Sequence, residues 1–550
     1  MSPENVPNSS GEKNENITYE RRSFEQYLID YQIPTKLADI GQTTVTGNGT
    51  LTKPYQINST QDFVYFANLG MNDKYFELNC DIVYNEETFD ENGNPSGGDG
   101  VYYEWRKTVY CARMNLDGKS HYLRGFFYED LDSVNTYSIF NSGKVNELKN
   151  IKLKNIYFNL FESVSALGSA VEYTTNVVFE KGYIYSRRTS AGIVYNSYKQ
   201  LSSCENYASV VALEHFAAGG VCYRNIGGVI KNCKNFGEVQ GISTSGGICV
   251  DLQKGKIYDC ENYARITVEL YHGAGIIGQV YYGGTIENCV NYGDVYTTTN
   301  QAIGGICGTV NGGFVEILNC DNYGRRCKAN GDINPNFGQM IGYITMQENK
   351  STTVITVKGC GSYSSYTGPI VGGTHQGSGN TGLLVVNIEY CFVKVFQDNS
   401  YNNYLFMFLR NNSVEVNARN NVVELESSRP DFKFSLFRYK VDDCPVKLNI
   451  ENLVVNAKIK TVLTPSEKEN LIVLISTYHN STYINVKNAI FNFDVDGEKT
   501  GIYYGDDFDD YCVSWKTGKM SVRAISGKDW FQQKVTEEML IEKGYEKRVD

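Results

Sequence analysis

Short runs of alternating apolar and polar residues fill most of the chain, and from residue 148 onward they return with a period of about 30 residues. The runs are rich in Val, Ile and Tyr and are separated by Asn or Gly, which is typical of strands joined by tight turns. In a first repeated motif, a small apolar residue follows Asn, Asp or Ser. Its central copies read SCENYA from Ser203, NCKNFG from Asn232, DCENYA from Asp259, NCVNYG from Asn288 and NCDNYG from Asn319. The pattern predicts a stack of near-equivalent structural units.

A second motif, Gly-Gly or Ala-Gly followed by aliphatic residues or cysteine, lies between the copies of the first. It reads AGIV from Ala191, GGVC from Gly219, GGIC from Gly246, AGII from Ala274 and GGIC from Gly304. Its glycines Gly220, Gly247, Gly275 and Gly305 are predicted to mark a corner where a side chain would collide or where φ is positive.

The two interleaved motifs predict an all-β fold. A coil of about 30 residues accommodates three short strands and their turns, and each strand can pair in parallel with its equivalent one coil further on. We therefore expect a right-handed parallel β-helix of about twelve coils with short helical caps. A leucine-rich repeat would carry an L-x-x-L-x-L signature, which the sequence lacks, and a propeller would need repeats of roughly 40 residues or more.

Most of the cysteines fall at repeat positions, and seven of them occupy the inward position of the first motif. The chain contains 15 cysteines, an odd number, and no pair has the C-x-x-C spacing of zinc or thioredoxin-like sites. Stacked Cα atoms would be close enough to bridge, so distance alone leaves disulfides open. Other small apolar residues replace cysteine in some coils, which favours reduced core cysteines. The Asn before the inward residue suits a left-handed turn and a hydrogen-bonded side-chain ladder along the stack. The aligned residues are Ile156, Val178, Cys204, Cys233, Cys260, Cys289, Cys320, Cys360, Cys391, Val422, Leu453 and Ala489.

Changes in composition along the chain predict five parts. Residues 1–18 are polar and aperiodic, which predicts a disordered arm, and residues 19–46 contain a short amphipathic helix capped by Ser23 and a linker. Residues 47–147 form an N-terminal entry module that closes one end of the solenoid, with a capped short helix over 60–67. Residues 148–500 are the repeats, and residues 501–550 are a C-terminal cap with a short helix that begins after Thr536.

The order of motifs in the entry module resembles a known family. A G-x-x-x-x-P-Y-x-I start at Gly49, the helix, a Y-F-x-L-x-x-D-I strand from Tyr75 and a D-G-x-x-H strand from Asp117 follow one another. This order, with the Gly-Gly-Ile-Cys-Gly sequence at Gly304, is similar to bacterial and phage surface proteins with GLUG-type repeats. The resemblance implies a right-handed β-helix on the extracellular face and a role in adhesion.

Three groups of residues are candidates for binding or chemistry. Exposed aromatic clusters are expected to stack on carbohydrate, namely Tyr102, Tyr103 and Trp105, and Tyr281 with Tyr282. The densest acidic group could hold a calcium ion, although a solvated loop is the alternative; its members are Asp506, Asp507, Asp509 and Asp510. No other cofactor is expected. A column of alternating charge is predicted to form a salt-bridge ladder along the stack, at Ser209, Glu238, Arg265, Asp294 and Arg325.

Charge and hydropathy exclude some classes of function. The net charge is −11 and the chain contains no block of Lys and Arg, so a general nucleic-acid binder is not expected. No apolar run is long enough for a transmembrane helix, so membrane insertion is not expected. The start at Met1 lacks the features of a signal peptide, which predicts either a trimmed chain or export by another route.

The sequence thus leads to a ranked set of functional hypotheses. The first is a non-enzymatic adhesin, or a spike- or tail-type protein, that binds a host glycan or protein receptor from the bacterial surface or a phage virion. A homotrimer is expected if the protein belongs to a virion. The alternatives are a polysaccharide lyase or glycoside hydrolase on the same fold, and a purely structural rod or scaffold.

Overall fold

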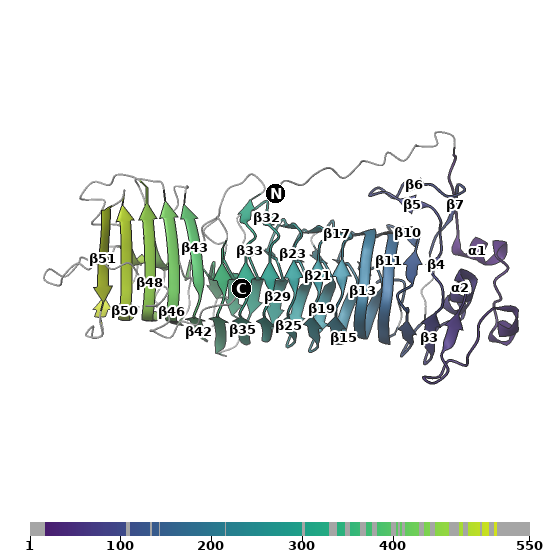
Figure 1. The fold of residues 1–550 in the computed structure, drawn as a ribbon, viewed down its shortest axis with the longest axis horizontal. Helices are drawn as coiled ribbons and strands as arrows, with labels where there is room; N and C mark the ends of the chain where they lie inside the picture. The colour runs from purple at the N-terminus through teal and green to yellow at the C-terminus, as the bar shows by residue number, and fades with distance from the viewer. Residues whose placement is uncertain are drawn as a thin grey trace.

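A computed structural model shows an all-β parallel β-solenoid in which 6% of the residues are helical (Figure 1). The predicted fold class is confirmed, with about nine turns rather than twelve, and the right-handed sense of the coil stays a prediction. The structure describes residues 17–513 except for 106–109, 133–134, 142, 215, 300–302, 329–337, 347–351, 364–369, 377–381, 398–402, 405–407, 410–412, 428–433, 440–445, 461–471, 477–481, 496–497 and 505–510.

In the central region each coil is made of very short strands that pair in parallel with their equivalents in the next coil. One coil contains β19 (Cys222–Ile226), β20 (Val229–Lys231), β21 (Lys234–Asn235), β22 (Val239–Gly241) and β23 (Thr244–Gly246). The next contains β24 (Cys249–Gln253), β25 (Lys256–Tyr258), β26 (Glu261–Asn262), β27 (Ile266–Val268) and β28 (His272–Ala274).

The same order continues toward the C-terminus with β29 (Ile277–Tyr281), β30 (Gly284–Glu287), β31 (Val290–Asn291), β32 (Val295–Thr297) and β33 (Ile303–Gly304), and then with β34 (Cys307–Asn311), β35 (Phe314–Leu318), β36 (Asp321–Asn322) and β37 (Arg326–Lys328). On the N-terminal side lie β8 (Asn115–Asp117), β9 (Tyr122–Arg124), β10 (Phe127–Asp130), β11 (Val145–Leu160), β12 (Val164–Ser165), β13 (Gly168–Ser186), β14 (Ser190–Ala191), β15 (Val194–Ser202), β16 (Glu205–Asn206), β17 (Ser209–Ala212) and β18 (Ala217–Gly219).

A left-handed residue bends the chain before each inward cysteine. Asn232, Asp259 and Asn288 have φ of 51°, 54° and 52°, which Asn and Asp adopt more readily than most residues, so the predicted turn geometry is confirmed. In the earlier coils the same conformation falls at Asn150 and Asn176.

The strand register corrects the predicted alignment at both ends of the ladder. Val178 pairs with Glu205, so the residue equivalent to Cys204 is Val177, and Ile151 pairs with Val177. The inward residues of these coils are therefore Ile151 and Val177, where Ile156 and Val178 were predicted. Val422 pairs with Phe392, so Asn421 rather than Val422 stands next to Cys391.

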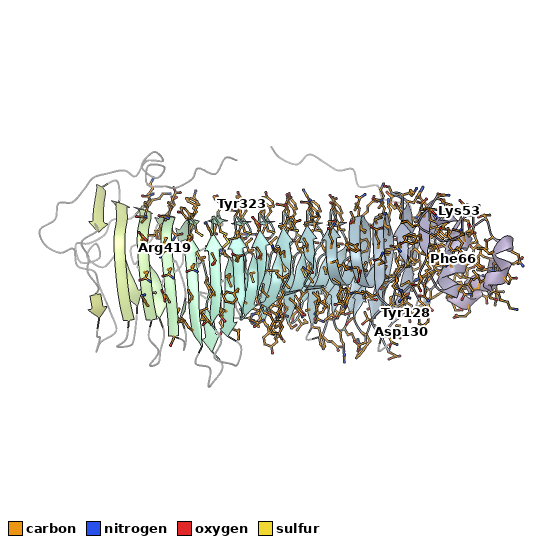
Figure 2. The ribbon with its side chains drawn as sticks, turned by 90° about the horizontal axis from the view of Figure 1, so that it is seen from below. Lys53, Phe66, Tyr128, Asp130, Tyr323 and Arg419 are labelled. Atoms are coloured by element: carbon orange, nitrogen blue, oxygen red, sulfur yellow. The ribbon has the colours of Figure 1, made fainter. Side chains whose placement is uncertain are left out.

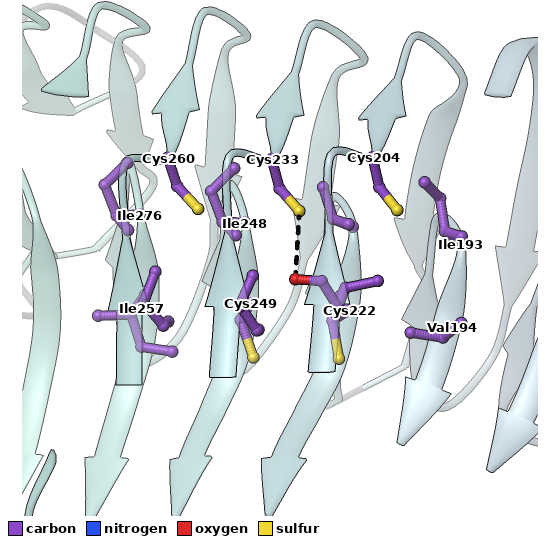
Figure 3. Close-up of a cluster of buried hydrophobic side chains, with 14 of the residues drawn as sticks. Ile193, Val194, Cys204, Cys222, Cys233, Ile248, Cys249, Ile257, Cys260 and Ile276 are labelled. Atoms are coloured by element: carbon purple, nitrogen blue, oxygen red, sulfur yellow. Dashed lines mark hydrogen bonds between the residues drawn. The ribbon is translucent and has the colours of Figure 1, made fainter. Parts of the chain in front are cut away.

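The inward cysteines line one side of the main core. Cys204, Cys233 and Cys260 stack in successive coils beside the isoleucines of the second motif, and each is fully buried (Figure 3). All three are free thiols, and the Sγ of Cys233 contacts the carbonyl oxygen of Leu201 at 3.8 Å. The structure thus places them as small apolar residues of the core.

Native protein should therefore resist thiol labelling at these positions. We expect N-ethylmaleimide at pH 8 to leave Cys204, Cys260 and Cys307 unmodified, because burial raises the pKa of the Cys307 thiol well above its usual value and shields the others. Half-buried Cys80, whose pKa burial also raises, should label slowly. Peptide mapping by mass spectrometry measures each site, and unfolding in guanidinium should expose all of them. Fast labelling of Cys260 in the native protein would contradict the packing.

The corner glycines allow adjacent coils to approach closely. A Cβ on Gly220 would lie 2.1 Å from the carbonyl oxygen of Gly247, and a Cβ on Gly247 would lie 2.0 Å from that of Gly275. On Gly275 a Cβ would lie 2.0 Å from Cγ of Asn291, and on Gly305 2.3 Å from the carbonyl oxygen of Gln339. Collision, rather than positive φ, explains these glycines, because none of them has a φ in the left-handed region.

A fully buried amide ladder runs beside the corner glycines. Asn206, Asn235, Asn262, Asn291 and Asn322 each lie one coil apart, and each Nδ2 donates to the Oδ1 of the next at 2.8–2.9 Å. Each also donates to a backbone carbonyl two residues further along its own coil. The ladder predicted at the Asn before the cysteine instead forms at the Asn two residues after the cysteine. The Asn before the cysteine makes only exposed contacts, such as Asn288 with Asp259 at 3.2 Å.

A smaller parallel sheet forms a lobe on the side of the stack. β12, β14, β18, β23, β28 and β33 make this six-stranded sheet, and it encloses a second core with β17, β22, β27 and β32. The residues of this second core are Val210, Ala212, Ala218, Val239, Ile266, Val268, Val295 and Ile303. Because β23 packs on β29 and β28 packs on β34, the lobe covers part of the outer face of those strands.

Two helices lie at the N-terminal end of the stack (Figure 1), and they pack on an aromatic core. The predicted helices are confirmed as α1 (Phe24–Asp30), capped by Ser23, and α2 (Thr60–Leu69), capped by Ser59. A 3-10 helix (Leu37–Gln42) lies between them. The strands of this region are β1 (Glu20–Arg22), β2 (Tyr55–Ile57), β3 (Tyr75–Leu78), β4 (Ile82–Val83), β5 (Thr88–Phe89), β6 (Pro95–Ser96) and β7 (Val101–Tyr103).

The prediction that Tyr102, Tyr103 and Trp105 are exposed is wrong. Their exposed fractions are 8%, 7% and 0%, because the two helices and the hairpin of β5 and β6 cover them. The Trp105 ring contacts Phe24 at 5.4 Å and Phe63 at 5.9 Å between centroids. These three residues hold the N-terminal end together and are not available to a glycan.

The C-terminal part of the described stack has longer strands and ends differently. Its strands are β38 (Ile341–Met346), β39 (Thr353–Lys358), β40 (Gly361–Ser362), β41 (Thr374–Gln376), β42 (Leu383–Glu389), β43 (Phe392–Gln397), β46 (Ser413–Ser427), β48 (Val446–Ile459) and β50 (Thr482–Val495). A separate sheet contains β44 (Asn403–Tyr404), β45 (Phe408–Leu409), β47 (Phe434–Tyr439) and β49 (Ile472–Ser476). β51 (Glu498–Tyr504) and β52 (Tyr511–Val513) both pair with β50 in the antiparallel sense.

Some predicted features lie outside the described residues. These are most of the N-terminal arm, the acidic group at Asp506, Asp507, Asp509 and Asp510, and the C-terminal helix. They stay predictions.

Candidate functional site

A column of polar side chains runs across the outer face of the strands that the lobe partly covers. Asn196, Arg224, Asp251, Gln279 and Thr309 occupy the same position in β15, β19, β24, β29 and β34. Each lies two residues after the first strand residue that points into the core, such as Cys222 or Cys249. The register alone therefore sets polar groups about 4.8 Å apart along the solenoid.

Hydrogen bonds join the centre of this polar column. The Arg224 guanidinium donates to Asp251 Oδ2 at 3.2 Å through both Nε and Nη2, and Gln279 Nε2 donates to Asp251 Oδ1 at 2.5 Å. The Tyr281 hydroxyl donates to Gln279 Oε1 at 3.0 Å. The result is one network of a cation, a carboxylate, an amide and a phenol.

Burial and charge act in opposite directions on Asp251. Its side chain is 3% exposed, whereas that of Arg224 is 32% exposed. Burial raises the pKa of the Asp251 carboxyl above its usual value, even though the bonds from Gln279 and Arg224 act to lower that pKa. Arg224 and Gln279, one coil away on either side, contact both oxygens of this buried carboxyl.

Two buried oxygens lie at the ends of the polar column. Asn196 Oδ1 and Thr309 Oγ1 have no hydrogen-bond partner among the described residues. A buried polar atom without a partner costs free energy, and in native proteins such atoms are normally paired with protein, water or ligand. Both atoms are inaccessible to solvent, so they are not available to a ligand in this structure.

Aromatic side chains border the polar column. On one side the rings of Tyr195 and Tyr223 stack at 4.6 Å, and the Arg224 guanidinium lies 5.0 Å from the Tyr223 ring. On the other side are Tyr281 and, at the adjacent corner, Tyr282, which is 55% exposed. Phenol rings beside amides and charges are typical of carbohydrate-binding sites, because the rings accept the apolar faces of sugars.

The corner at Tyr282 is the most exposed part of this border. Tyr282 has a left-handed backbone with φ of 64°, and its ring lies 5.9 Å from Nζ of Lys254 in the preceding coil. In the following coil Phe314 is 70% exposed. The backbones of these two coils touch here, since a Cβ on Gly283 would lie 2.6 Å from the carbonyl oxygen of Phe314. The corner therefore presents two accessible rings and one ammonium group.

The predicted binding residues thus lie in two different environments. It joins Tyr281 and Tyr282 to a polar network, and it buries Tyr102, Tyr103 and Trp105 in the N-terminal core. Sequence reasoning missed Arg224, Asp251 and Gln279. A signal for them existed, because each lies five residues after the start of a second motif.

The alternating charge column is only partly a salt-bridge ladder. Arg325 forms an ion pair with Asp294, as predicted. Arg265 instead lies 4.3 Å from the centre of the Tyr296 ring. No group of three or more His, Cys, Asp or Glu side chains within the described part of the chain is arranged to hold a metal ion.

Comparisons with known proteins give no family for the chain: no family model matches it, and no curated protein matches it. Within the described residues no helix is long and apolar enough to cross a membrane.

Proposed function

We propose that the protein is a non-enzymatic, surface-exposed β-solenoid that acts as an adhesin or spike and binds a host glycan. The observation that carries this proposal is the polar column of Arg224, Asp251 and Gln279 bordered by Tyr281 and the exposed ring of Tyr282. The resemblance of the repeats and the entry module to GLUG-type surface proteins supports the same role and an extracellular location. A rigid stack suits a protein that must present such a site away from a surface.

The binding mode follows from the chemistry of the side chains. The half-exposed guanidinium of Arg224 and amide of Gln279 can exchange hydrogen bonds with hydroxyls of an extended oligosaccharide, and buried Asp251 holds both side chains in place. One sugar would stack on the Tyr282 ring, next to Lys254. The glycan would then lie along the solenoid axis, because the polar groups are arranged in that direction.

A glycan array probed with the full chain tests the proposal, and titration of the best ligand then tests the site. Tyr282→Asn removes the ring and keeps a residue that tolerates the left-handed backbone. We expect it to weaken binding at least tenfold, on the order of 1.4 kcal/mol, with unchanged circular dichroism. Gln279→Ala should weaken binding similarly, since it removes a hydrogen-bonding group from the column.

Tyr390 offers a matched control for Tyr282. It also has a left-handed backbone, with φ of 54°, is 40% exposed and lies 5.5 Å from a lysine, Lys358, but it belongs to another corner. Tyr390→Asn should leave glycan affinity unchanged. Equal losses in both variants would show that this site is not the binding site, and a blank array would favour a structural rod.

One observation favours the second candidate, a polysaccharide lyase or glycoside hydrolase. A buried carboxyl with a raised pKa beside an arginine and a tyrosine, as at Asp251, is a common setting for proton transfer. Incubation with a polysaccharide panel, followed by measurement of reducing ends and of absorbance from unsaturated products, tests it. Products that disappear in Asp251→Asn would replace the adhesin proposal with the enzyme.

A further inference from the structure

An exposed ridge of stacked aromatic rings runs along another edge of the solenoid. It contains the aromatic residue of each first motif, and Figure 2 shows Tyr323 on this edge among side chains that project from successive coils. Neighbouring rings are 4.5–5.3 Å apart and within 14° of parallel, and the four tyrosines of the central coils are 41–45% exposed. Its members from Tyr207 onward are Tyr207, Phe236, Tyr263, Tyr292 and Tyr323, and the stack continues to Tyr363 at 4.7 Å and 11°.

Stacking determines what the aromatic ridge can bind. Each inner ring has both faces covered by its neighbours, so a sugar cannot stack on it in the way proposed for Tyr282. What remains accessible is a continuous row of ring edges that repeats with the strand spacing of about 4.8 Å. A partner with the same repeat would fit this row best, and a second copy of the chain has that repeat.

Charged rows flank the aromatic ridge on both sides. Two residues before each ring are Glu205, Lys234, Glu261, Val290 and Asp321, and two residues after each ring are Ser209, Glu238, Arg265, Asp294 and Arg325. In both rows the side chains are half-buried or exposed. Within one chain they pair along the axis, as in Lys234 with Glu261 at 3.1 Å and Asp294 with Arg325.

A two-fold axis parallel to the solenoid axis would place the row of residues before the rings in one copy opposite the row of residues after the rings in the other copy. Equivalent coils of the two copies would then lie side by side. Lys234 would then face the partner's Glu238, Glu261 the partner's Arg265, and Asp321 the partner's Arg325. All three contacts join opposite charges. The rows of a single chain are thus complementary to each other across such an axis.

The antiparallel arrangement depends on its register. With the axis perpendicular to the solenoid and centred on Tyr263, Glu205 would face the partner's Asp321, and Arg265 the partner's Arg265, so like charges meet. With the axis between Tyr263 and Tyr292, Lys234 would face the partner's Asp321, and Arg265 the partner's Asp294, so opposite charges meet. Charge thus disfavours the first antiparallel register, and cross-linking distinguishes the second from the parallel pair.

We propose that the aromatic ridge is a self-association surface, on which two copies of the chain pair side by side, parallel and in register. The five rungs form a strip about 24 Å long and about 13 Å wide, estimated from strand geometry. Interfaces that bury less than about 1,000 Å² in total are weak, so the dimer should form reversibly and depend on concentration. The inference is independent of the glycan site, which lies on a different face.

Engineered cysteines test the predicted register. Tyr207 lies at one end of the aromatic ridge, so Tyr207→Cys should give a disulfide-linked dimer under mild oxidation only if the copies are parallel. Tyr263→Cys lies at the centre and should cross-link in either orientation. The described native cysteines are buried apart from half-buried Cys80, so the wild-type chain provides the background. Cross-linking through Tyr263→Cys without Tyr207→Cys would overturn the parallel dimer, and no cross-linking in either would overturn self-association at the ridge.

Charge reversal tests the complementarity in solution without any covalent bond. Sedimentation equilibrium of the full chain up to about 100 µM should detect a monomer–dimer equilibrium, because contacts of this size are weak. Lys234→Glu should raise the dissociation constant at least fivefold, and the double reversal Lys234→Glu with Glu238→Lys should restore most of the affinity. Lys256→Glu, an exposed reversal on β25 away from the ridge, is the matched control and should change nothing. Failure of the double reversal to rescue, or a trimer, would overturn the proposal.

Discussion

Gly247→Ala should destabilise the protein by about 3 kcal/mol or more, the largest effect that we expect from adding a single methyl group. The new Cβ would lie 2.0 Å from the carbonyl oxygen of Gly275 and 2.6 Å from Cγ of Asn262. The first contact is with backbone, which cannot rotate away, and the second is with a side chain held by hydrogen bonds to both neighbouring coils. Thermal and guanidinium unfolding followed by circular dichroism measure the loss.

A glycine elsewhere in the same coil gives the control for this substitution. Gly227 has φ of 70°, and a Cβ there would meet nothing within 4 Å. Gly227→Asn should cost less than about 1 kcal/mol, because Asn tolerates the left-handed backbone. If Gly247→Ala unfolds at the same denaturant concentration as the wild type, the coils do not approach as closely at this corner as the structure indicates.

Asn262→Ala should also be severely destabilising, by about 3–5 kcal/mol, because it removes the middle of the buried amide ladder. The Asn262 amide accepts from Asn235 and donates to Asn291 and to the carbonyl oxygen of Ala264, each at 2.9 Å. Without it, groups of all three partners lose a hydrogen bond in the protein interior. An unpaired buried polar group costs about 1–3 kcal/mol.

Asn288, an exposed asparagine in the next coil, is the control that separates the effect of burial from the loss of an amide contact. Asn288 also donates to a side chain one coil away, Asp259, but at the surface. Asn288→Gly keeps the left-handed turn possible and should cost less than about 1 kcal/mol. Similar unfolding midpoints for Asn262→Ala and Asn288→Gly would contradict the structural importance of the buried ladder.

The repeat motifs predict the architecture because each position of a coil faces the same environment in every copy. Cys204 and Cys233 identified an inward position, and Asn232 a left-handed turn, since small apolar residues and Asn recur where packing and backbone conformation demand them. The alignment failed near Val178 and Val422, where cysteine is absent, although the left-handed residues Asn176 and Asn420 still mark the turn there.

The candidate site was only partly predictable, because it depends on contacts between distant segments. Tyr281 and Tyr282 were found as an aromatic pair. The importance of Asp251 comes from its burial and from its hydrogen bonds with Arg224 and Gln279 in the two neighbouring coils, and nothing in the local sequence indicates that burial. For the same reason Trp105 could not be distinguished from an exposed aromatic residue until α1 and α2 were seen to pack over it.

The antiparallel strands at the far end of the stack have a consequence for the length of the molecule. If no strand followed it, β50 would offer its outer edge to another parallel coil, from this chain or from a neighbouring molecule. The stack of coils could then grow end to end. Instead, β51 pairs with Ala489–Val495, and β52 pairs with Thr482–Ile484, both running the opposite way. A parallel coil therefore finds most of the β50 edge already hydrogen-bonded, and the next edge belongs to strands that run the opposite way.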